Sequence, residues 1–499
     1  MLHRTVGSAP LLARFLEALL FLRAYPDDPD VMALAERALV RFAERLRPRP
    51  RGRPSAPTSL DERGIAGTAL FLPLSLRAAR WLASRGAGQA RLDRDATPGD
   101  LDPILPHVVP PSREEALVDI GVPFWRWLDA ALPRNPRSDL GWVTDRVADA
   151  GAAAIAVYDL VQPRIRWDLG TGPMSRTRLR TPSGPPFYHT EPLRRGRGTV
   201  GGFLRTPVPA RAPVGGEALA FLDAAQAAVL TRYREVHAFN WADPRDVTLA
   251  DLGRGVRLAW FGIRPSRRLP LRAHYGYLLA KNGVPVGYGD ASLLFEWVNL
   301  AYNVFETYRG GEAAVMLVRL LAFLHQHFGT RVFHLDRYQI GYANEEALAS
   351  GAYWFYDRLG FRSRQLALRR LAAAERRRLA ADPGYRSPRE TLARLAEDGV
   401  VLSLGRSQDH RARTFDIGRL GRRALALTHA GGDGEAALTR RAAARLGVRG
   451  LTRWRAGERA ALAGWAPVLL ALRGLDRWPS RERGALRGTI RAKAGPREA

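Results

Sequence analysis

Two glycines stand between a strand-like stretch and a long amphipathic helix in the segment FETYRGGEAAVMLVRLLAFLHQHFG, residues 305–329. Glycine lets a ligand approach the backbone closely, and the free N–H groups at the start of a helix attract anions. Arg309, Gly310 and Gly311 therefore predict a turn that binds an anion such as a phosphate. Glu312 follows directly, and its negative charge would either repel that anion or simply complement the helix dipole.

The elements around this turn predict an α/β unit. In the helix after the turn, apolar residues recur at intervals of three and four, as on a face that packs against a sheet. These residues are Ala313, Met316, Leu317, Leu320, Leu321 and Leu324. Upstream, Asn282-Gly283 lies between two apolar runs and predicts a β-hairpin. Downstream, the pattern predicts a strand at 331–335 and a single helix over 344–359.

This order of elements, together with the ending GAYWFYDRLGF at 351–361, resembles the GCN5-related N-acetyltransferase (GNAT) superfamily. The resemblance is limited to residues 250–365. It implies an α/β fold with a mixed, mostly antiparallel sheet and flanking helices, in which two central strands splay apart. It also implies that the protein transfers an acyl group from acetyl-CoA or another acyl-CoA to an amine.

The resemblance gives roles to individual residues by position. Those expected to hold the acyl-CoA are Arg309, Gly310, Gly311, Ala314 and Asn344. Tyr356 corresponds to the tyrosine that acts as general acid and protonates the departing thiolate. Two positions depart from the family pattern. Glu312 stands where the family usually has a glycine, and Asn344 lies about five residues too early relative to Tyr356, so the helix is either longer than usual or preceded by an extra turn.

Several carboxylates could serve as the general base that takes a proton from the amine. Glu306 lies three residues before Arg309, at the end of the expected central strand, where it could accept the proton through a water molecule. Glu296 lies earlier on the adjoining stretch. Either residue could instead be an exposed acid at a strand end. Glu306 is the preferred candidate.

Polar residues lie within and just after the expected strand at 331–335. His334 and Asp336 alternate along it, and Tyr338 and Gln339 come just after. They could line a pocket for the acceptor at the end of the strand, or be ordinary loop residues. A metal site is not expected. His325 and His327 are two residues apart on a helix and so face different directions, and the chain has no cysteine.

The formal net charge of +28 is unusually high. Residues 365–499 contribute +16 of it, from 29 basic and 13 acidic side chains. Such a charge favours an anionic partner, for example a nucleic acid or an acidic carrier protein. Because only Lys281 and Lys493 are lysines, the arginines could also reflect codon bias in a GC-rich genome. The absence of cysteine excludes disulfides and cysteine nucleophiles.

The composition changes along the chain and predicts six segments. These are an N-terminal helical hairpin (1–48), a Pro/Arg linker (49–60), a helical domain (61–160), a Pro/Gly/Arg-rich surface segment (161–215), the GNAT-like domain (216–375) and a basic helical region (376–499). The apolar stretch near the N-terminus is interrupted by charges and is too short to span a bilayer. It also lacks the cleavage pattern of a signal peptide, so we expect a cytoplasmic protein.

Three functions are therefore compatible with the sequence. The first is an acyl-CoA-dependent N-acyltransferase that acts on a small-molecule or protein amine. The second is a non-catalytic relative that serves as a binding or scaffold protein and contacts a polyanion through its C-terminal arginines. The third is an acyltransferase whose donor is an acyl carrier protein or an aminoacyl-tRNA.

Overall fold

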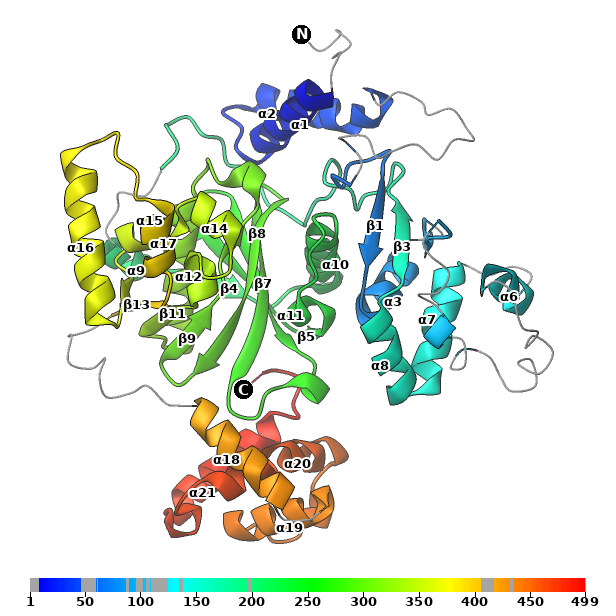
Figure 1. Cartoon of the computed structure of the whole chain (residues 1–499), viewed down its shortest axis with the longest axis vertical. Coiled ribbons are helices and arrows are strands. Elements are labelled where there is room, and N and C mark those ends of the chain that lie inside the picture. The colour runs from blue at the N-terminus through cyan, green and yellow to red at the C-terminus, as the bar shows by residue number, and fades with distance from the viewer. Residues whose placement is uncertain are drawn as a thin grey trace.

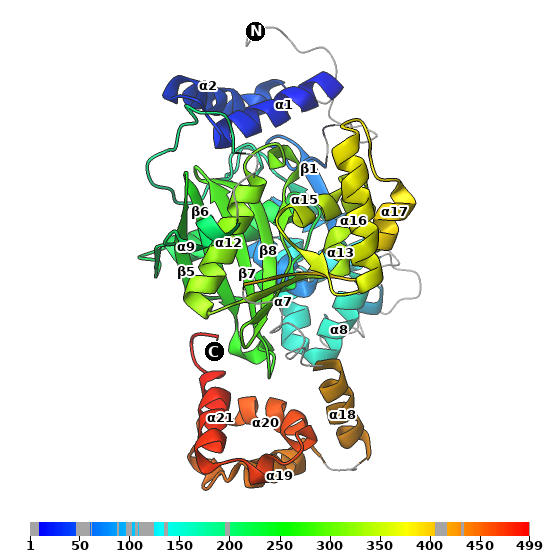
Figure 2. The same cartoon turned by 90° about the vertical axis from the view of Figure 1, so that its left-hand side faces the viewer.

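The computed structural model describes residues 9–45, 60, 62–86, 89–95, 102–104, 108, 124–133, 138–194, 200–404, 417–430 and 434–498. A large central sheet with helices on both faces forms the middle of the molecule (Figure 1). The N-terminal helices lie at one end of this sheet and the C-terminal helices at the other, as two perpendicular views show (Figure 2).

The central sheet has ten strands and is mostly antiparallel, as expected. They are β4 (Ala210–Arg211), β5 (Ala242–Gly253), β6 (Val256–Ile263), β7 (Ala273–Lys281), β8 (Val284–Leu294), β9 (Trp297–Leu300), β10 (Asn303–Val304), β11 (Val332–Leu335), β12 (Arg362–Ser363) and β13 (Val400–Ser403). Their order is β12-β13-β11-β9-β8-β7-β6-β5-β4, and β10 pairs with β8. Only β9 and β11 run parallel among these described pairs.

The hairpin between β7 and β8 confirms the prediction made from Asn282-Gly283. Both residues have positive φ, 49° and 77°, as the tight turns that join antiparallel strands require. Asn282 also binds two other segments of the protein: its side-chain amide donates to the carbonyls of Ala24 and Phe187, both at 3.0 Å.

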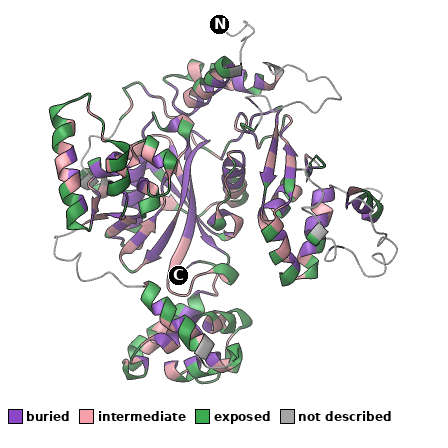
Figure 3. Ribbon diagram, viewed as in Figure 1, coloured by how far each residue is buried: buried purple, intermediate pink, exposed green. Residues whose placement is uncertain are grey.

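Helices cover the two faces of the sheet. The predicted amphipathic helix is α12 (Ala313–Phe328), and its apolar residues are buried on one face. On the opposite face lie α10 (Glu217–Leu230) and α11 (His237–Asn240), visible to the other side of β7 and β8 in Figure 1. The strands and α10 are largely buried, whereas the outer helices expose one side (Figure 3).

The segment expected to form one helix over 344–359 is broken. It forms α14 (Glu345–Ala349) and α15 (Ala352–Arg358), separated at Gly351, whose φ of 64° is left-handed. A continuous helix cannot pass through that conformation. The break accounts for the long spacing between Asn344 and Tyr356.

Residues 61–160 were expected to be helical, and the structure corrects this. The helices α3 (Leu76–Arg85), α6 (Phe124–Ala131), α7 (Asp139–Ala150) and α8 (Ala152–Val161) surround a three-stranded sheet of order β1-β3-β2. The strands are β1 (Ala69–Pro73), β2 (Ala90–Leu92) and β3 (Arg164–Asp168). The strand β3 lies in the segment 161–215, which was expected to be a surface segment. Its pairing with β1 and β2 therefore joins that segment to the predicted helical domain.

Before this unit, α1 (Ala9–Ala24) and α2 (Pro29–Val40) form the predicted helical hairpin and bury Leu16, Leu20 and Leu39 against each other. Between β12 and β13 of the central sheet lie α16 (Leu366–Ala381) and α17 (Arg389–Leu395), and β13 was not anticipated. The C-terminal helices are α18 (Ile417–Ala430), α19 (Glu435–Leu446), α20 (Ala456–Ala471) and α21 (Ser480–Ala492).

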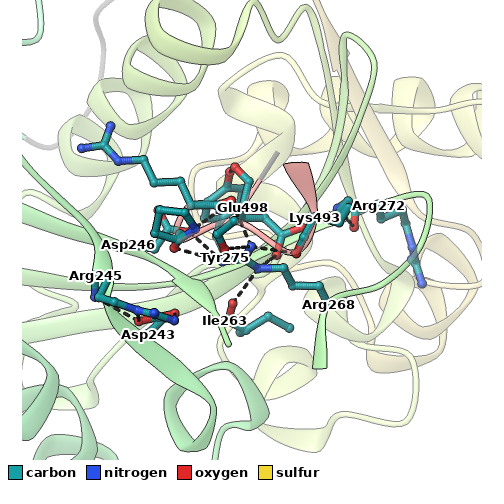
Figure 4. A network of polar contacts seen from close by, with 12 residues as sticks. Asp243, Arg245, Asp246, Ile263, Arg268, Arg272, Tyr275, Lys493 and Glu498 are labelled. Carbon is teal, nitrogen blue, oxygen red and sulfur yellow. Dashed lines mark hydrogen bonds and ion pairs between the residues drawn. The ribbon is translucent and has the colours of Figure 1, made fainter. Parts of the chain in front are cut away.

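The segment after α21 returns to the central sheet and wraps around Arg268 (Figure 4). The Arg268 guanidinium donates to the carbonyls of Lys493, Gly495 and Arg497 within 3.0 Å and pairs with the Glu498 carboxylate at 3.1 Å. The Glu498 amide donates to Asp246 at 2.6 Å. The C-terminal helices are thus held to β5 and to the loop after β6 by buried polar contacts.

Candidate functional site

The strands β9 and β11 pair only over a short stretch and then separate. Their register runs from Val332 opposite Trp297 to His334 opposite Asn299. Beyond that point the chain after β9 stays with β8, because the Ala301 amide donates to the Asp290 carbonyl at 2.9 Å and β10 also pairs with β8. The backbone that faces β11 is therefore left without a strand partner at Tyr302.

Two side chains satisfy the backbone of Tyr302 in place of a strand. Its amide donates to Gln339 Oε1 at 3.2 Å, and its carbonyl accepts from Tyr356 Oη at 3.3 Å. The Tyr302 hydroxyl donates to the carbonyl of Ala313 in the first turn of α12, at 2.7 Å. The predicted acid Tyr356, the start of α12 and the point where the strands separate are thereby brought together.

Tyr356 is buried, with 4% of its surface exposed. Burial raises the pKa of its hydroxyl well above the ordinary value, and the charge of Arg309 opposes that rise only in part. The phenol therefore keeps its proton at neutral pH. Its hydrogen bond to Tyr302 is long, so the hydroxyl could turn from a carbonyl to another acceptor at small cost. This arrangement suits a proton donor, and it also suits a buried tyrosine that only satisfies the backbone.

The glycine turn has one open and one covered position. A side chain at Gly310 would meet no atom within 4 Å, whereas a Cβ on Gly311 would lie 2.5 Å from the ring of Tyr25. Tyr25 follows α1 and is 2% exposed. Arg309 is exposed and forms an ion pair with Glu346 of α14. The turn is thus accessible at Gly310, while Gly311 makes room for the N-terminal segment.

Glu312 does not point outward from the turn. Its side chain is 2% exposed, pairs with Arg254 at 2.7 Å and lies 3.7 Å from Lys281 Nζ. It also accepts from the Arg194 amide at 3.0 Å. Burial disfavours the carboxylate, but the hydrogen bonds from Arg254 and Arg194 and the charge of Lys281 lower the pKa of Glu312 below its ordinary value. Its negative charge is therefore compensated inside the protein.

The cations of this network are themselves held in place. Burial lowers the pKa of Lys281 to about 8, although the charge of Glu312 opposes the shift. Its Nζ donates to the Arg254 carbonyl and lies 5.0 Å from the centre of the Tyr25 ring. His189 lies beside Arg254, and burial with the charge of Lys281 lowers the pKa of His189 to about 4. The histidine therefore stays neutral among the charges.

The N-terminal hairpin is attached next to the turn by further polar contacts. Glu17 accepts hydrogen bonds from Thr307 and Arg176, the latter at 3.0 Å. Arg23, whose exposed fraction is 1%, donates to the carbonyls of Thr177 and Arg176 at 2.8 and 2.9 Å. These contacts place α1 against the segment that precedes α12.

The remaining predicted site residues have other surroundings. Glu306 is exposed on a short 3-10 helix, Glu306–Tyr308, at the end of the β10 segment. Asn344 caps α14: it accepts from the Ala347 amide at 3.1 Å and donates to the Tyr338 carbonyl at 3.0 Å. Ala314 is half-buried in the first turn of α12. Glu296 contributes its carbonyl to Arg331 and Val332.

Sequence reasoning identified only His334 from a set of polar side chains on the α10/α11 face of the sheet. His274, Ser292, Asn299 and His334 lie directly opposite one another on β7, β8, β9 and β11. Asp290 lies two residues before Ser292 and so shares its face. Alternation of polar residues along β8 was the available signal, but the pairing of four strands was needed to align them.

Among the described residues, no group of three or more histidine, aspartate or glutamate side chains could hold a metal ion. No helix in the described ranges is long and apolar enough to cross a membrane. Comparisons with protein-family models, curated proteins and solved structures found no match to this chain.

Proposed function

We propose that this protein is an N-acyltransferase that transfers an acyl group from acyl-CoA to an amine, with its reaction centre where β9 and β11 separate. The observation that carries the proposal is the arrangement at Tyr302, whose backbone amide and carbonyl are met by Gln339 and Tyr356 instead of by β11. An extended donor such as a pantetheine arm could bind these two backbone groups in place of the Gln339 and Tyr356 side chains. A GNAT-like fold and a cytoplasmic location are parts of the same proposal.

Tyr356 has the role of general acid in this proposal. When the amine nitrogen attacks the thioester carbonyl, a C–N bond forms and the C–S bond breaks. The Tyr356 hydroxyl gives its proton to the departing sulfur, the amine loses one proton to water or to a base, and the phenolate then regains a proton from solvent. Because burial keeps the phenol protonated, the acid is in its reactive form across the neutral pH range.

The turn before α12 supports in part the proposal that the protein binds acyl-CoA. Gly310 is open, Arg309 adds positive charge, and Glu312 is neutralised by Arg254 and Lys281, so the objection that this glutamate repels a pyrophosphate is weakened. The ring of Tyr25 beside Gly311 limits the approach to that residue. An acyl-CoA would therefore contact the turn on the Gly310 side.

The position of Tyr25 beside the turn also favours a second candidate function. If Tyr25 keeps a CoA pyrophosphate from the turn, the donor would be an acyl carrier protein or an aminoacyl-tRNA, whose anionic surface suits the arginines of α18 to α21. Binding of such a polyanion would weaken steeply with salt, since arginine contacts to phosphates release counterions. Non-catalytic binding of a polyanion would show the same salt dependence without release of a thiol.

Calorimetric titration of the full chain with acetyl-CoA, and with free CoA beside it, tests the first proposal. We expect the wild type and Tyr356→Phe to bind acetyl-CoA equally, and Tyr356→Phe to release CoA at least ~100-fold more slowly in the presence of a panel of primary amines. Tyr158→Phe is the matched control, because Tyr158 is also fully buried but lies in the other α/β unit. Absence of acetyl-CoA binding by both wild type and Tyr25→Ala would overturn the acyl-CoA proposal.

A further inference from the structure

Asp290 is a half-buried position within an otherwise buried stretch of β8, because Ala291, Ser292 and Leu293 after it are buried again. Residues Val284 to Gly289 are buried on both faces, whereas Asp290 is only half-buried. On the neighbouring strands β9 and β11, residues alternate between half-buried and buried. The half-buried positions include Asn299 and His334, on the face that α10 and α11 cover farther along. Near the point where β9 and β11 separate, this face of the sheet is therefore partly accessible.

The side chains of this accessible face are polar and are ordered by hydrogen bonds across the strands. His274 Nδ1 lies 2.9 Å from Ser292 Oγ, and His334 Nδ1 lies 3.0 Å from Asn299 Oδ1. Burial lowers the pKa of His274 to about 4 and also lowers the pKa of His334. Both imidazoles are therefore neutral at pH 7, and the pairs present hydrogen-bonding groups without charge.

Asp290 is the one carboxylate on this face of β8. Among the described residues it has neither an ion-pair partner nor a side-chain hydrogen bond, and burial raises the pKa of its carboxyl group. An ionised carboxylate that is partly desolvated and lacks a cation is unfavourable, so it would gain from a positively charged ligand. In a chain with 77 arginines and lysines, the lack of a basic partner is a notable feature of this position.

Asp290 is also next to the proposed reaction centre. Its carbonyl accepts from the Ala301 amide, and the following residue is Tyr302, whose carbonyl meets Tyr356. The side chain of Tyr302 reaches α12 on one face of the sheet, and the side chain of Asp290 is on the other face. Donor and acceptor could thus approach the same backbone from opposite faces.

We infer that Asp290, together with the His274–Ser292 and Asn299–His334 pairs, forms the binding site for the acceptor, and that this acceptor is a primary amine bound as its ammonium form. The inference rests on the proposed acyltransferase function and specifies the substrate class of that site. The ammonium group pairs with the Asp290 carboxylate and gives one proton to water before its nitrogen attacks the thioester, and hydroxyl or amide groups elsewhere on the acceptor bond to the two polar pairs. Anionic acceptors are excluded by the same carboxylate.

Ligand-observed fluorine NMR on the full chain tests the site without requiring a reaction. The probe is 4-fluorobenzylamine, which is an ammonium ion at pH 7, and 4-fluorobenzyl alcohol is its uncharged counterpart. We expect the wild type to broaden the amine signal and not the alcohol signal, and Asp290→Asn to weaken amine binding at least ~10-fold through loss of the charge-assisted contact. Asp145→Asn, an exposed carboxylate of α7, should leave binding unchanged.

Three results would overturn the inference: equal binding of the amine and the alcohol, no binding of the amine by the wild type, or undiminished binding by a folded Asp290→Asn. Loss of binding in Glu306→Gln but not in Asp290→Asn would move the amine site to the turn. The acetyl-CoA titration reports separately on the donor. Amine binding without acetyl-CoA binding would reject only the proposed donor, whereas acetyl-CoA binding without amine binding would reject only the acceptor site.

Discussion

The ring of Tyr25 fills the space beside Gly311 in which every other residue type would carry a Cβ, at 2.5 Å from that position. We expect Gly311→Ala to destabilise the protein by ~1–3 kcal/mol, because a methyl group inserted into a packed site forces its neighbours to shift. Tyr25→Ala should remove the clash. Its cost in unfolding free energy should therefore be smaller in the Gly311→Ala background than in the wild type. Urea unfolding of the four proteins measures this coupling.

Gly310→Ala is the control for that cycle, since a side chain there has no neighbour within 4 Å. It should change the free energy of unfolding by a few tenths of a kcal/mol at most. If Gly311→Ala and Gly310→Ala were equally mild, the N-terminal segment would not be packed against the turn in solution.

Glu312→Gln should destabilise the protein by ~3–5 kcal/mol, because it leaves the buried Lys281 and the half-buried Arg254 without their carboxylate. Lys281→Met in the same chain should recover part of this loss, since it removes one of the uncompensated charges. Thermal and urea unfolding measure both variants. Equal unfolding free energies of wild type and Glu312→Gln would show that the network is open to water.

Stability should fall with acid between pH 6.5 and 4 because of His274. Burial, followed by the charges of His237 and Arg272, lowers the pKa of His274 in the folded chain to about 4. In the unfolded chain the pKa is near 6.5, so in this window the unfolded state binds the proton and the folded state does not. The free energy of unfolding therefore decreases as the pH falls from 6.5 to 4.

The variant His274→Gln isolates this contribution. Its unfolding free energy should depend less steeply on pH in that window than that of the wild type, because unfolding of the variant takes up as much as one proton fewer. Urea titrations at several pH values measure the two slopes. His189 also has a lowered pKa and acts in the same window, so the difference between the two proteins is the informative quantity. Parallel pH profiles of wild type and His274→Gln would contradict the prediction.

Arg268→Ala should release the segment 493–498 from the central sheet. The substitution removes the group that binds four backbone carbonyls of this segment and leaves Glu498 with Lys493 as its basic partner. We expect faster proteolysis between α21 and residue 498 and a lower unfolding temperature. Arg245→Ala is a suitable control, because Arg245 pairs with the nearby Asp243 but is largely exposed. Unchanged proteolysis in Arg268→Ala would argue against a docked segment.

Local patterns of the sequence were sufficient for the elements closest to the turn. Asn282-Gly283 predicted the β7–β8 hairpin because a tight turn needs two residues with positive φ, and the apolar spacing after Glu312 predicted α12. The long spacing between Asn344 and Tyr356 left either a longer helix or an extra turn open, and the structure has the second, with the break at Gly351. The strands β5 and β13 were not anticipated, since each forms through pairing with distant residues.

The candidate site was predictable only in part for the same physical reason. Tyr356 and the turn were found from the chain itself, but the surroundings of Glu312 come from Arg254 and Lys281, which are far away in sequence. A glutamate at a helix start has the same local pattern whether it faces solvent or a buried lysine. Asp290 likewise became noticeable only when its lack of a partner could be seen.

The contacts around Arg268, with Leu271 packed against the C-terminal helices, attach these helices to the sheet in addition to the covalent chain after β13. The non-covalent attachment behaves as a peptide ligand tethered to its own receptor, so its effective concentration is high without strong intrinsic affinity. Cutting the chain between Ser403 and Ile417 would turn this into a bimolecular interaction. The two fragments would then stay together only at concentrations above the dissociation constant of these non-covalent contacts.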